Sequence, residues 1–347
     1  MKLPQFQHLL AKKKVDLAFL LYDDPNVQYF LGAEFTGGFL LVTPKKATLL
    51  ISPLDHFNKK NGITVEPLRK EWEKKHGART VRTLGINKSH LTIDVFERLK
   101  KYFPKAKIYD LCEDLQQLRL KKTKEELRSI RTACILTSAA FQSLCQELTK
   151  KTLKTEQDVA LHLESFIRKE GGTIAFPTIV AMGKNAAIPH HNTSITPLSR
   201  GFLLLDFGAR VNSYCADMSR MVFLGKPTVA QEEMYFLLLA AQEQAIAAVK
   251  ENVALSRLDK IARQKLGKYA STFNHALGHG IGIEVHEAPV FSKAKTTIQR
   301  NVPFTIEPGV YFPGKYGLRI EDTLVWTGTK VEILTKAPKG LISIHSF

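Results

Sequence analysis

The amino-acid sequence predicts an α+β protein with two domains, a small α/β domain over residues 1–120 and a larger domain over residues 121–347. The first observation is length, because 347 residues exceed what one hydrophobic core usually organises. The second is the alternation of short apolar runs with helix-like segments in the first third of the chain. The third is a repeated order of elements in the remainder, two helices and then a hairpin, which indicates an internal duplication.

The composition is that of a globular protein and excludes several other classes. Hydrophobic residues make up 44% of the chain and charged residues 24%, so neither a disordered nor a fibrous protein is expected. The longest apolar runs fall well short of the roughly 20 residues that span a membrane, so no membrane partner is expected. Cysteines without CxxC spacing predict a reducing, cytoplasmic setting. They are Cys112, Cys134, Cys145 and Cys215.

The net charge of +17 makes nucleic acid a partner to consider. Basic residues outnumber acidic ones by 21 to 13 up to residue 120 and by 29 to 20 after it, so the excess is spread along the chain. No basic motif with interleaved aromatic residues accompanies it. We therefore expect no nucleic-acid partner and interpret the charge as a solvated basic surface.

The first domain is predicted to contain a strand near its start, then a hairpin, a helix and a further strand. The hairpin turns at Pro44-Lys45-Lys46. The helix ends near Pro104, since proline cannot continue a helix. In order, these elements are expected over Val15–Tyr22, Gly38–Val42, Thr48–Ser52, Leu91–Tyr102 and Lys107–Tyr109.

Capping signals place the first helices of the larger domain. Thr123 and Glu126 have the spacing of a capping box, in which each side chain satisfies a backbone N–H at the start of a helix. Apolar residues then recur at helical spacing from 127 to 148, so one face of this helix is buried. A second box at Thr155 and Asp158 opens the next helix. The hairpin that follows is expected over Gly201–Ala209 and Tyr214–Phe223.

The same order then recurs. Thr228 with Gln231 and Ser256 with Asp259 have capping-box spacing and predict two further helices. These helices are expected to run to about Glu251 and about Tyr269. The strands of the second hairpin are expected over Pro303–Phe312 and Leu318–Trp326.

Two aspartates occupy unusual places in the first hairpin. Asp206 follows four apolar residues and precedes Phe207, where a charged side chain is rarely buried unless it is paired or binds a metal. A symmetric turn about Val211 and Asn212 would pair residues whose numbers sum to 423. That register predicts that Asp206 lies directly opposite Asp217.

The second hairpin repeats this arrangement with Glu307 and Glu321. Their numbers sum to 628, and the midpoint, Gly314, lies within an apparent turn at residues 313–315. Like charges directly opposite one another destabilise a sheet, so a positive group is required between the acids. The spacing between the two hairpins is nearly the same for both pairs of acids, and we therefore expect all four to converge.

The positive group between the acids could come from either of two sources. Arg220 and Arg319 lie two or three residues from an acid, so a structural network of salt bridges is one interpretation. The other is a metal site, which clustered histidines favour. Three of these histidines lie in the glycine-rich stretch 275–286, where glycines are expected to let the backbone approach a ligand. The clustered histidines are His190, His191, His275, His279 and His286.

Four carboxylates with one imidazole predict a site for two divalent metal ions. Oxygen-rich ligand sets with one nitrogen suit manganese, iron(II), cobalt or zinc, and we expect manganese first. Two such ions would neutralise the opposed acids and could polarise a water molecule. The same glycine-rich stretch lacks the GxGxxG spacing and the following helix of a dinucleotide loop.

Several ordered motifs resemble a known family over nearly the whole chain. The sequence is similar to the pita-bread metallopeptidases, in the branch of the Xaa-Pro aminopeptidases and prolidases. It departs from the family at Ala276-Leu277, where Gly-Thr is more common, and at Met182, where Ser is common. The matching segments are Ile179–His190, Leu205–Gly208 with Ala216–Arg220, His275–Pro289, Thr305–Gly309 and Arg319–Asp322.

The resemblance implies a creatinase-like N-terminal domain, a pita-bread catalytic domain and specific roles for the site residues. It implies that His190 and His286 flank the reacting carbonyl and the leaving group. It also implies that Glu307 is the base for the attacking water and that Arg319 orients the nearby acids, with His275 in support. Asp217 and Glu321 would bridge the metals. The implied metal ligands are Asp206, Asp217, His279, Glu307 and Glu321.

The activity that the resemblance implies is metal-dependent hydrolysis of the bond between an N-terminal residue and proline. Its substrates would be peptides with proline at the second position, and relatives commonly form homodimers. A strict Xaa-Pro dipeptidase is the alternative, since the sequence does not identify which cation would bind a free proline carboxylate. A binding protein that keeps the fold is a non-enzymatic alternative, which the complete ligand set disfavours.

Overall fold

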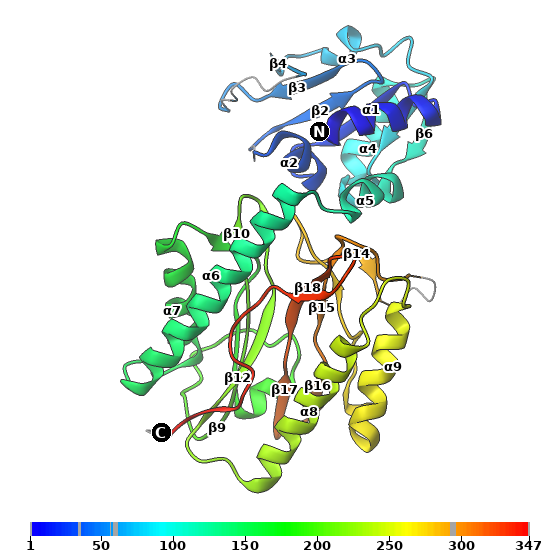
Figure 1. Cartoon of the computed structure of the whole chain (residues 1–347). Coiled ribbons are helices and arrows are strands. Elements are labelled where there is room, and N and C mark those ends of the chain that lie inside the picture. The colour runs from blue at the N-terminus through cyan, green and yellow to red at the C-terminus, as the bar shows by residue number, and fades with distance from the viewer. Residues whose placement is uncertain (1, 34–35, 56, 58–61, 292–295, 346–347) are drawn as a thin grey trace. The chain divides into compact units, whose positions relative to one another are not determined.

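The computed structural model describes all residues except 1, 34–35, 56, 58–61, 292–295 and 346–347. The chain divides into two compact units, Met1–Leu120 and Lys121–Phe347 (Figure 1). Each unit has its own clusters of buried apolar side chains. Among the described residues, no helix is both long and apolar enough to cross a lipid bilayer.

The first unit contains one six-stranded sheet in the order β4-β3-β2-β1-β5-β6. The predicted hairpin is confirmed, because β2 and β3 pair antiparallel on either side of residues 43–46. Strands β5 and β6 add in parallel beside β1, and β4 adds in parallel beside β3. The strands are β1 (Leu17–Leu21), β2 (Gly38–Val42), β3 (Ala47–Ile51), β4 (Ile63–Pro67), β5 (Thr83–Ile86) and β6 (Lys107–Asp110).

Helices cover both faces of this sheet because its central strand is apolar on both sides. Successive side chains of a strand point to opposite faces. Ala18 and Leu20 belong to a buried cluster that includes residues of α1, whereas Leu17 and Phe19 belong to a cluster that includes residues of α4. The helices are α1 (Lys2–Lys13), α2 (Pro25–Leu31), α3 (Trp72–Lys75), α4 (Ile93–Tyr102) and α5 (Cys112–Leu120).

Three of the four capping boxes predicted for the second unit are present. At the first, the Thr123 backbone N–H donates to Glu126 Oε2 at 2.6 Å, and Thr123 Oγ1 accepts from the Glu126 N–H at 3.3 Å. Boxes of the same kind open the next helix and the first helix of the repeat. The helices are α6 (Lys124–Thr149), α7 (Glu156–Lys169), α8 (Val229–Ala247) and α9 (Leu255–Leu266).

The box expected at Ser256 and Asp259 is wrong. Helix α9 begins two residues earlier, at Leu255 after Ala254, and has no side-chain cap. Asp259 instead forms an ion pair with Arg263 one turn along the same helix. The two helices also end before the expected residues, since α8 stops at Ala247 and the chain after α9 tightens into a 3₁₀ turn.

The predicted duplication is visible as two helix pairs, each followed by strands (Figure 1). Residues of α6 and α7 are buried with β8, β9 and β12, and residues of α8 and α9 are buried with both sets of strands. The first set of strands is β7 (Thr173–Ile174), β8 (Ile179–Met182), β9 (Gly201–Phe207), β10 (Ala209–Val211), β11 (Tyr214–Cys215) and β12 (Met218–Leu224). The second set is β13 (His279–Gly280), β14 (Glu287–Val290), β15 (Pro303–Ile306), β16 (Gly309–Phe312), β17 (Tyr316–Arg319), β18 (Asp322–Trp326), β19 (Val331–Ile333) and β20 (Ile342–Ile344).

A buried ion pair between Arg220 and Asp322 joins β12 to β18 and yields a stability prediction. Arg220 Nη2 donates to Asp322 Oδ1 at 2.7 Å, and the side chains are 1% and 0% exposed. Replacing Asp322 by Asn leaves the arginine charge buried without its counter-charge, and we expect a loss of about 3–5 kcal/mol in the free energy of unfolding. Urea denaturation measures this loss. The control is Asp259→Asn, which breaks a more exposed ion pair and should cost under about 1 kcal/mol.

Candidate metal centre

The first hairpin has a different register from the one predicted. Met218 pairs with Phe207, so Asp206 lies opposite Ser219 and not opposite Asp217. The reason is the turn, where Asn212 and Ser213 both have positive φ values of 49° and 72°. Positive φ at both central residues is typical of a type I′ hairpin turn, whose centre lies one residue later than we assumed. Because the register shifts by two residues, both aspartates still lie on the same face.

The second hairpin has the predicted register. Gly309 pairs with Arg319 and Ile306 with Asp322, so the numbers of paired residues sum to 628. Glu307 lies in the short gap between β15 and β16, and Glu321 lies in the matching gap between β17 and β18. The two glutamates therefore occupy equivalent places on adjacent strands, in short irregular segments where the paired strands are interrupted.

Hydrogen bonds connect the two hairpins directly beside these acids. Thr323 Oγ1 donates to the Asp217 carbonyl at 2.8 Å and accepts from the Asp217 N–H at 3.3 Å. The Glu321 N–H donates to the Ser219 carbonyl at 3.1 Å, and Ser219 Oγ donates to Glu321 Oε2 at 2.9 Å. The duplicated halves are thus joined at the acidic residues themselves.

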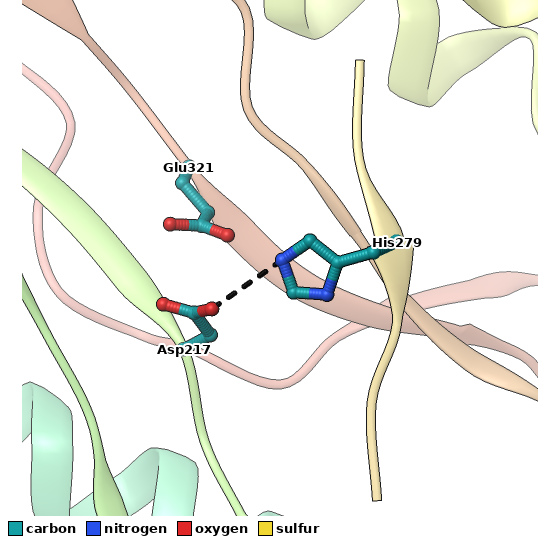
Figure 2. Close-up of side chains that lie close together, drawn as sticks. All are labelled: Asp217, His279 and Glu321. Carbon is teal, nitrogen blue, oxygen red and sulfur yellow. Dashed lines mark ion pairs between the residues drawn. The ribbon is translucent and has the colours of Figure 1, made fainter. Parts of the chain in front are cut away.

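Three of the predicted ligands form a compact cluster. Ligand atoms of Asp217, His279 and Glu321 all lie within 4.8 Å of one another. Figure 2 shows the three side chains pointing toward one another, with Asp217 Oδ2 3.5 Å from His279 Nε2. Glu307 extends this cluster, because its Oε1 lies 3.4 Å from the same nitrogen.

Asp206 adjoins the cluster but is also held by an arginine. Arg319 Nη2 donates to Asp206 Oδ2 at 2.5 Å, so the salt-bridge interpretation holds for this one acid. Arg319 also donates to Ser219 Oγ, to the Tyr311 hydroxyl and to the Pro189 carbonyl. In the described part of the chain, the side chains of Asp217, Glu307 and Glu321 have no arginine partner.

The remaining acids are held in an unfavourable electrostatic environment. Burial, and then the charges of Asp206 and Glu307, raise the pKa of Asp217 well above its ordinary value. Burial and the charge of Asp217 also raise the pKa of Glu321 well above its ordinary value. Burial and the charge of Glu321 raise the pKa of Glu307 to about 8. Without cations the cluster therefore favours protonated carboxyls.

Unsatisfied oxygens show that the site fits cations. Asp206 Oδ1, Asp217 Oδ1 and Glu321 Oε1 are buried, and none has a hydrogen-bond partner among the described residues. Buried polar atoms normally find a partner, so three such oxygens from three neighbouring acids require an explanation. Divalent cations would supply the missing contacts, and carboxylates with an imidazole are suitable donors for manganese, iron(II), cobalt or zinc.

The histidines divide between this cluster and other places. The rings of His279 and His286 lie 4.1 Å apart between centroids. Burial, and then the electrostatic effect of the neighbouring His279, lower the pKa of His286 to about 4, so its imidazole is neutral at neutral pH. His190 is exposed beside this group, whereas His191 Nε2 lies 2.9 Å from Glu156 Oε2, outside the acid cluster.

His275 reaches the site through a tyrosine that the sequence analysis missed. His275 Nε2 lies 2.9 Å from the Tyr311 hydroxyl, which also accepts a hydrogen bond from Arg319. Ser219 was missed as well, although it contacts both Arg319 and Glu321. Its position two residues after Asp217 on a hairpin strand is a signal that would have placed it on the same face.

The glycines of the stretch 275–286 have a structural role that differs from the expected one. A Cβ atom on Gly278 would lie 2.0 Å from the Thr305 carbonyl oxygen, and one on Gly280 would lie 2.3 Å from Ala288. These glycines therefore allow neighbouring segments of the protein to pack closely around His279. The expectation that glycines in this stretch let the backbone approach a ligand stays a prediction.

The fold and the acid cluster together define a two-domain protein of the metallohydrolase class. A model for metallopeptidase family M24 matches residues 128–328, and a model for the creatinase/prolidase N-terminal domain matches residues 2–121. The chain belongs to metallopeptidase family M24. This confirms the resemblance drawn from the motifs, with a creatinase-like N-terminal domain followed by a pita-bread domain.

Relatives of known name match over nearly the full length. The Xaa-Pro dipeptidase of Pyrococcus horikoshii is 34% identical, and the match covers 98% of this chain and 98% of the relative. The crystal structure of the prolidase from the same organism has a TM-score of 0.90 at 32% identity, covering 98% of this chain and 99% of that one. The X-Pro aminopeptidase from Thermotoga maritima has a TM-score of 0.86 at 30% identity, covering 95% and 98%.

The raised pKa of Glu307 yields a prediction for the protein with its metals removed by a chelator. The folded state holds this proton up to about pH 8, whereas the ordinary pKa is 4.5. The contribution of the protonated Glu307 carboxyl to the free energy of unfolding is therefore fully present below about pH 4.5, and it is lost as the pH rises toward 8. We expect the chelated wild type to lose stability relative to Glu307→Gln across this range, by at least about 2 °C in Tm.

Thermal denaturation of both proteins at several pH values in chelator measures this difference. Saturating Mn²⁺ is the control, because bound cations favour the ionised carboxyl and should reverse the trend for the wild type. Parallel stability curves for the two chelated proteins would show that Glu307 is not held protonated.

Proposed function

We propose that this protein is a metal-dependent peptidase that hydrolyses the bond between an N-terminal residue and a following proline. The observation that carries the proposal is the convergence of acids from two hairpins beside His279 of β13, in a chain of family M24. Full-length similarity to proteins named Xaa-Pro dipeptidase, prolidase and X-Pro aminopeptidase supports the choice of proline-containing substrates.

The proposed ligand set would hold two divalent ions, with Asp217 and Glu321 among the ligands. Manganese is the first choice and cobalt, zinc and iron(II) are the alternatives, because the donors are mainly carboxylate oxygens. When bound, such ions polarise the scissile carbonyl and make water more acidic. The full set is Asp206, Asp217, His279, Glu307 and Glu321.

The side chains around this set perform the proton transfers. Glu307 takes the proton of the attacking water, a role that suits a carboxyl group whose surroundings raise its affinity for protons. In this proposal His286 and His190 flank the reacting carbonyl and the leaving group, where the neutral imidazole of His286 can exchange a proton or a hydrogen bond. The proline nitrogen must be protonated as it leaves, and Glu307 can return to it the proton taken from the water.

Arg319 positions the acids for this reaction. Its guanidinium contacts Asp206, Ser219 and Tyr311 at once, and the Arg319 side chain is itself buried. His275 supports the same arrangement through the Tyr311 hydroxyl. We assign both residues to orientation of the site.

The choice between an aminopeptidase and a strict dipeptidase depends on the length of the substrate. The Pyrococcus horikoshii relative is called an Xaa-Pro dipeptidase, which favours the second candidate, whereas the Thermotoga maritima structure favours the first. We expect the chelated protein to be inactive and Mn²⁺ to restore cleavage of an Xaa-Pro-Yaa tripeptide. Cleavage of the Xaa-Pro dipeptide alone would identify a prolidase, and cleavage of neither would reject the proposal.

A homodimer in the cytoplasm completes the proposal. The four cysteines are free in the structure, which suits a reducing compartment. Sedimentation of the purified protein tests the dimer, since a mass near 78 kDa, about twice the 39.0 kDa chain, is expected.

Asp217→Asn tests the metal site. The substitution removes a charged ligand that is 4% exposed, and we expect both the bound metal and kcat/KM to fall, the latter by about 100-fold or more. Metal content by mass spectrometry and hydrolysis rates give the two values. Asp23→Asn, at an exposed position in the first unit, should change neither. A fully active Asp217→Asn protein would remove Asp217 from the metal site.

A further inference from the structure

The first unit contains a pocket that has no part in the proposed reaction. Its volume is about 430 Å³, within the range of small-molecule sites. Aromatic rings form much of its lining, and Phe39 and Trp72 pack against each other with ring centroids 4.4 Å apart. The aromatic lining residues are Phe19, Tyr22, Phe39, Trp72 and Tyr102.

The charged side chains that line this pocket are basic. Arg69, Lys70 and Arg98 line it together with apolar and aromatic residues, and no aspartate or glutamate among the described residues does. Arg98 forms an ion pair with Asp94 on its own helix. Arg69 and Lys70 are exposed, and within the described residues neither has an ion-pair partner.

The backbone beside these cations adopts an uncommon conformation. Glu71, between Lys70 and Trp72, has a φ of 61° in the left-handed region, which is unusual for a residue with a side chain. This conformation begins α3 and lets the Trp72 ring and the preceding cations line the same pocket. Such backbone strain is often found where a ligand is bound.

We propose that this pocket binds a small planar aromatic molecule that carries an anionic group, such as a phosphate or a carboxylate. The aromatic walls offer faces on which a flat ring can stack. Arg69 and Lys70 offer charge-assisted hydrogen bonds to the anion at the same opening. An uncharged apolar ligand would leave the two cations without a role, and a non-aromatic anion would leave the rings without one.

Fluorescence of Trp72 can report binding directly. The chain has two tryptophans, so Trp326→Phe leaves Trp72 as the single tryptophan and serves as the parent protein. AMP and indole-3-acetate are the test ligands, and adenosine and indole-3-acetamide are their uncharged counterparts. Calorimetry measures all four, and fluorescence is used for the adenine pair only, because the indole ligands fluoresce as tryptophan does. We expect saturable binding of an anion, about tenfold tighter than binding of its uncharged counterpart at low salt.

Matched variants assign the binding to the pocket. The pair Arg69→Gln with Lys70→Gln should weaken anion binding by about tenfold, whereas Lys12→Gln with Lys105→Gln, which removes the same charge elsewhere in this unit, should not. Tyr22→Ala should weaken the binding of both members of each ligand pair, because an aromatic stacking surface is lost. Peptidase activity should stay unchanged in every variant and confirms folding.

Four results would overturn the proposal. The first three are no saturable binding of either anion below about 5 mM, equal binding of the charged and uncharged ligands, and equal effects of the two charge variants. A fourth is Trp72 emission that depends on protein concentration and on no ligand, which would assign the pocket to a second copy of the chain.

A separate observation concerns Glu156, a buried acid at the start of α7. Its side chain is fully buried and accepts hydrogen bonds from both ends of the segment 182–194. Oε1 accepts from the Met182 N–H at 2.7 Å and from Asn185 Nδ2 at 2.8 Å. Oε2 accepts from the Ser194 N–H and hydroxyl and lies 2.9 Å from His191 Nε2.

We infer that Glu156 is a positioning residue for His190. The Glu156 carboxylate accepts hydrogen bonds from residues on both sides of His190 in the sequence. Removal of this carboxylate would therefore free the backbone that carries the His190 imidazole. The inference rests on the proposed function, since it requires that His190 acts on the substrate. A residue that only stabilises the fold would affect Tm without affecting kcat of the folded enzyme.

A double-mutant cycle tests this role. Glu156→Gln should lower kcat by about tenfold with metal content unchanged, and it should cost no further activity in a His190→Ala background. Glu164→Gln on the same helix is the control. Additive losses in the double variant would overturn the inference. An active His190→Ala protein would instead reject the role of His190 in the proposed function.

Discussion

Mutual repulsion among buried carboxylates is the constraint on which this structure depends. Two hairpins bring Asp206, Asp217, Glu307 and Glu321 to one place, and reciprocal hydrogen bonds beside the acids prevent the hairpins from separating. Within the described parts of the chain only Asp206 of these four acids receives an arginine, so the other three must be protonated or must share cations. Metal binding would therefore relieve an unfavourable arrangement that the fold itself imposes, and binding of metal and stability of the fold are thermodynamically linked.

Local signals in the sequence were sufficient for the elements and for one of the two registers. Capping boxes such as Thr123 with Glu126 depend on residues three apart, and the structure reproduces them. The second hairpin was placed correctly because Gly314 marks the centre of its turn. The first was misplaced because Asn212 and Ser213 take positive φ values without a glycine to indicate them. A turn centre was thus the main uncertainty in pairing the acids.

Tertiary contacts account for what the sequence did not reveal. Tyr311 gains its importance from Arg319 and His275, to which it is joined only in the folded chain. Glu156 opens α7 and looks like an ordinary acidic residue of a first helical turn, yet it is buried and hydrogen-bonded to a segment about 30 residues away. The convergence of the acids was foreseeable from the duplication, whereas the partners that hold them required the structure.

Arg319 also bonds to the Pro189 carbonyl, next to His190, and this contact has a consequence for the design of new specificities. Its flat guanidinium reaches Asp206 in one direction and Pro189 in another, which a lysine could not do with a single ammonium group. Engineering the backbone of this segment to admit a different peptide would disturb the same guanidinium that holds Asp206. Altered selectivity and intact metal affinity would therefore have to be selected together.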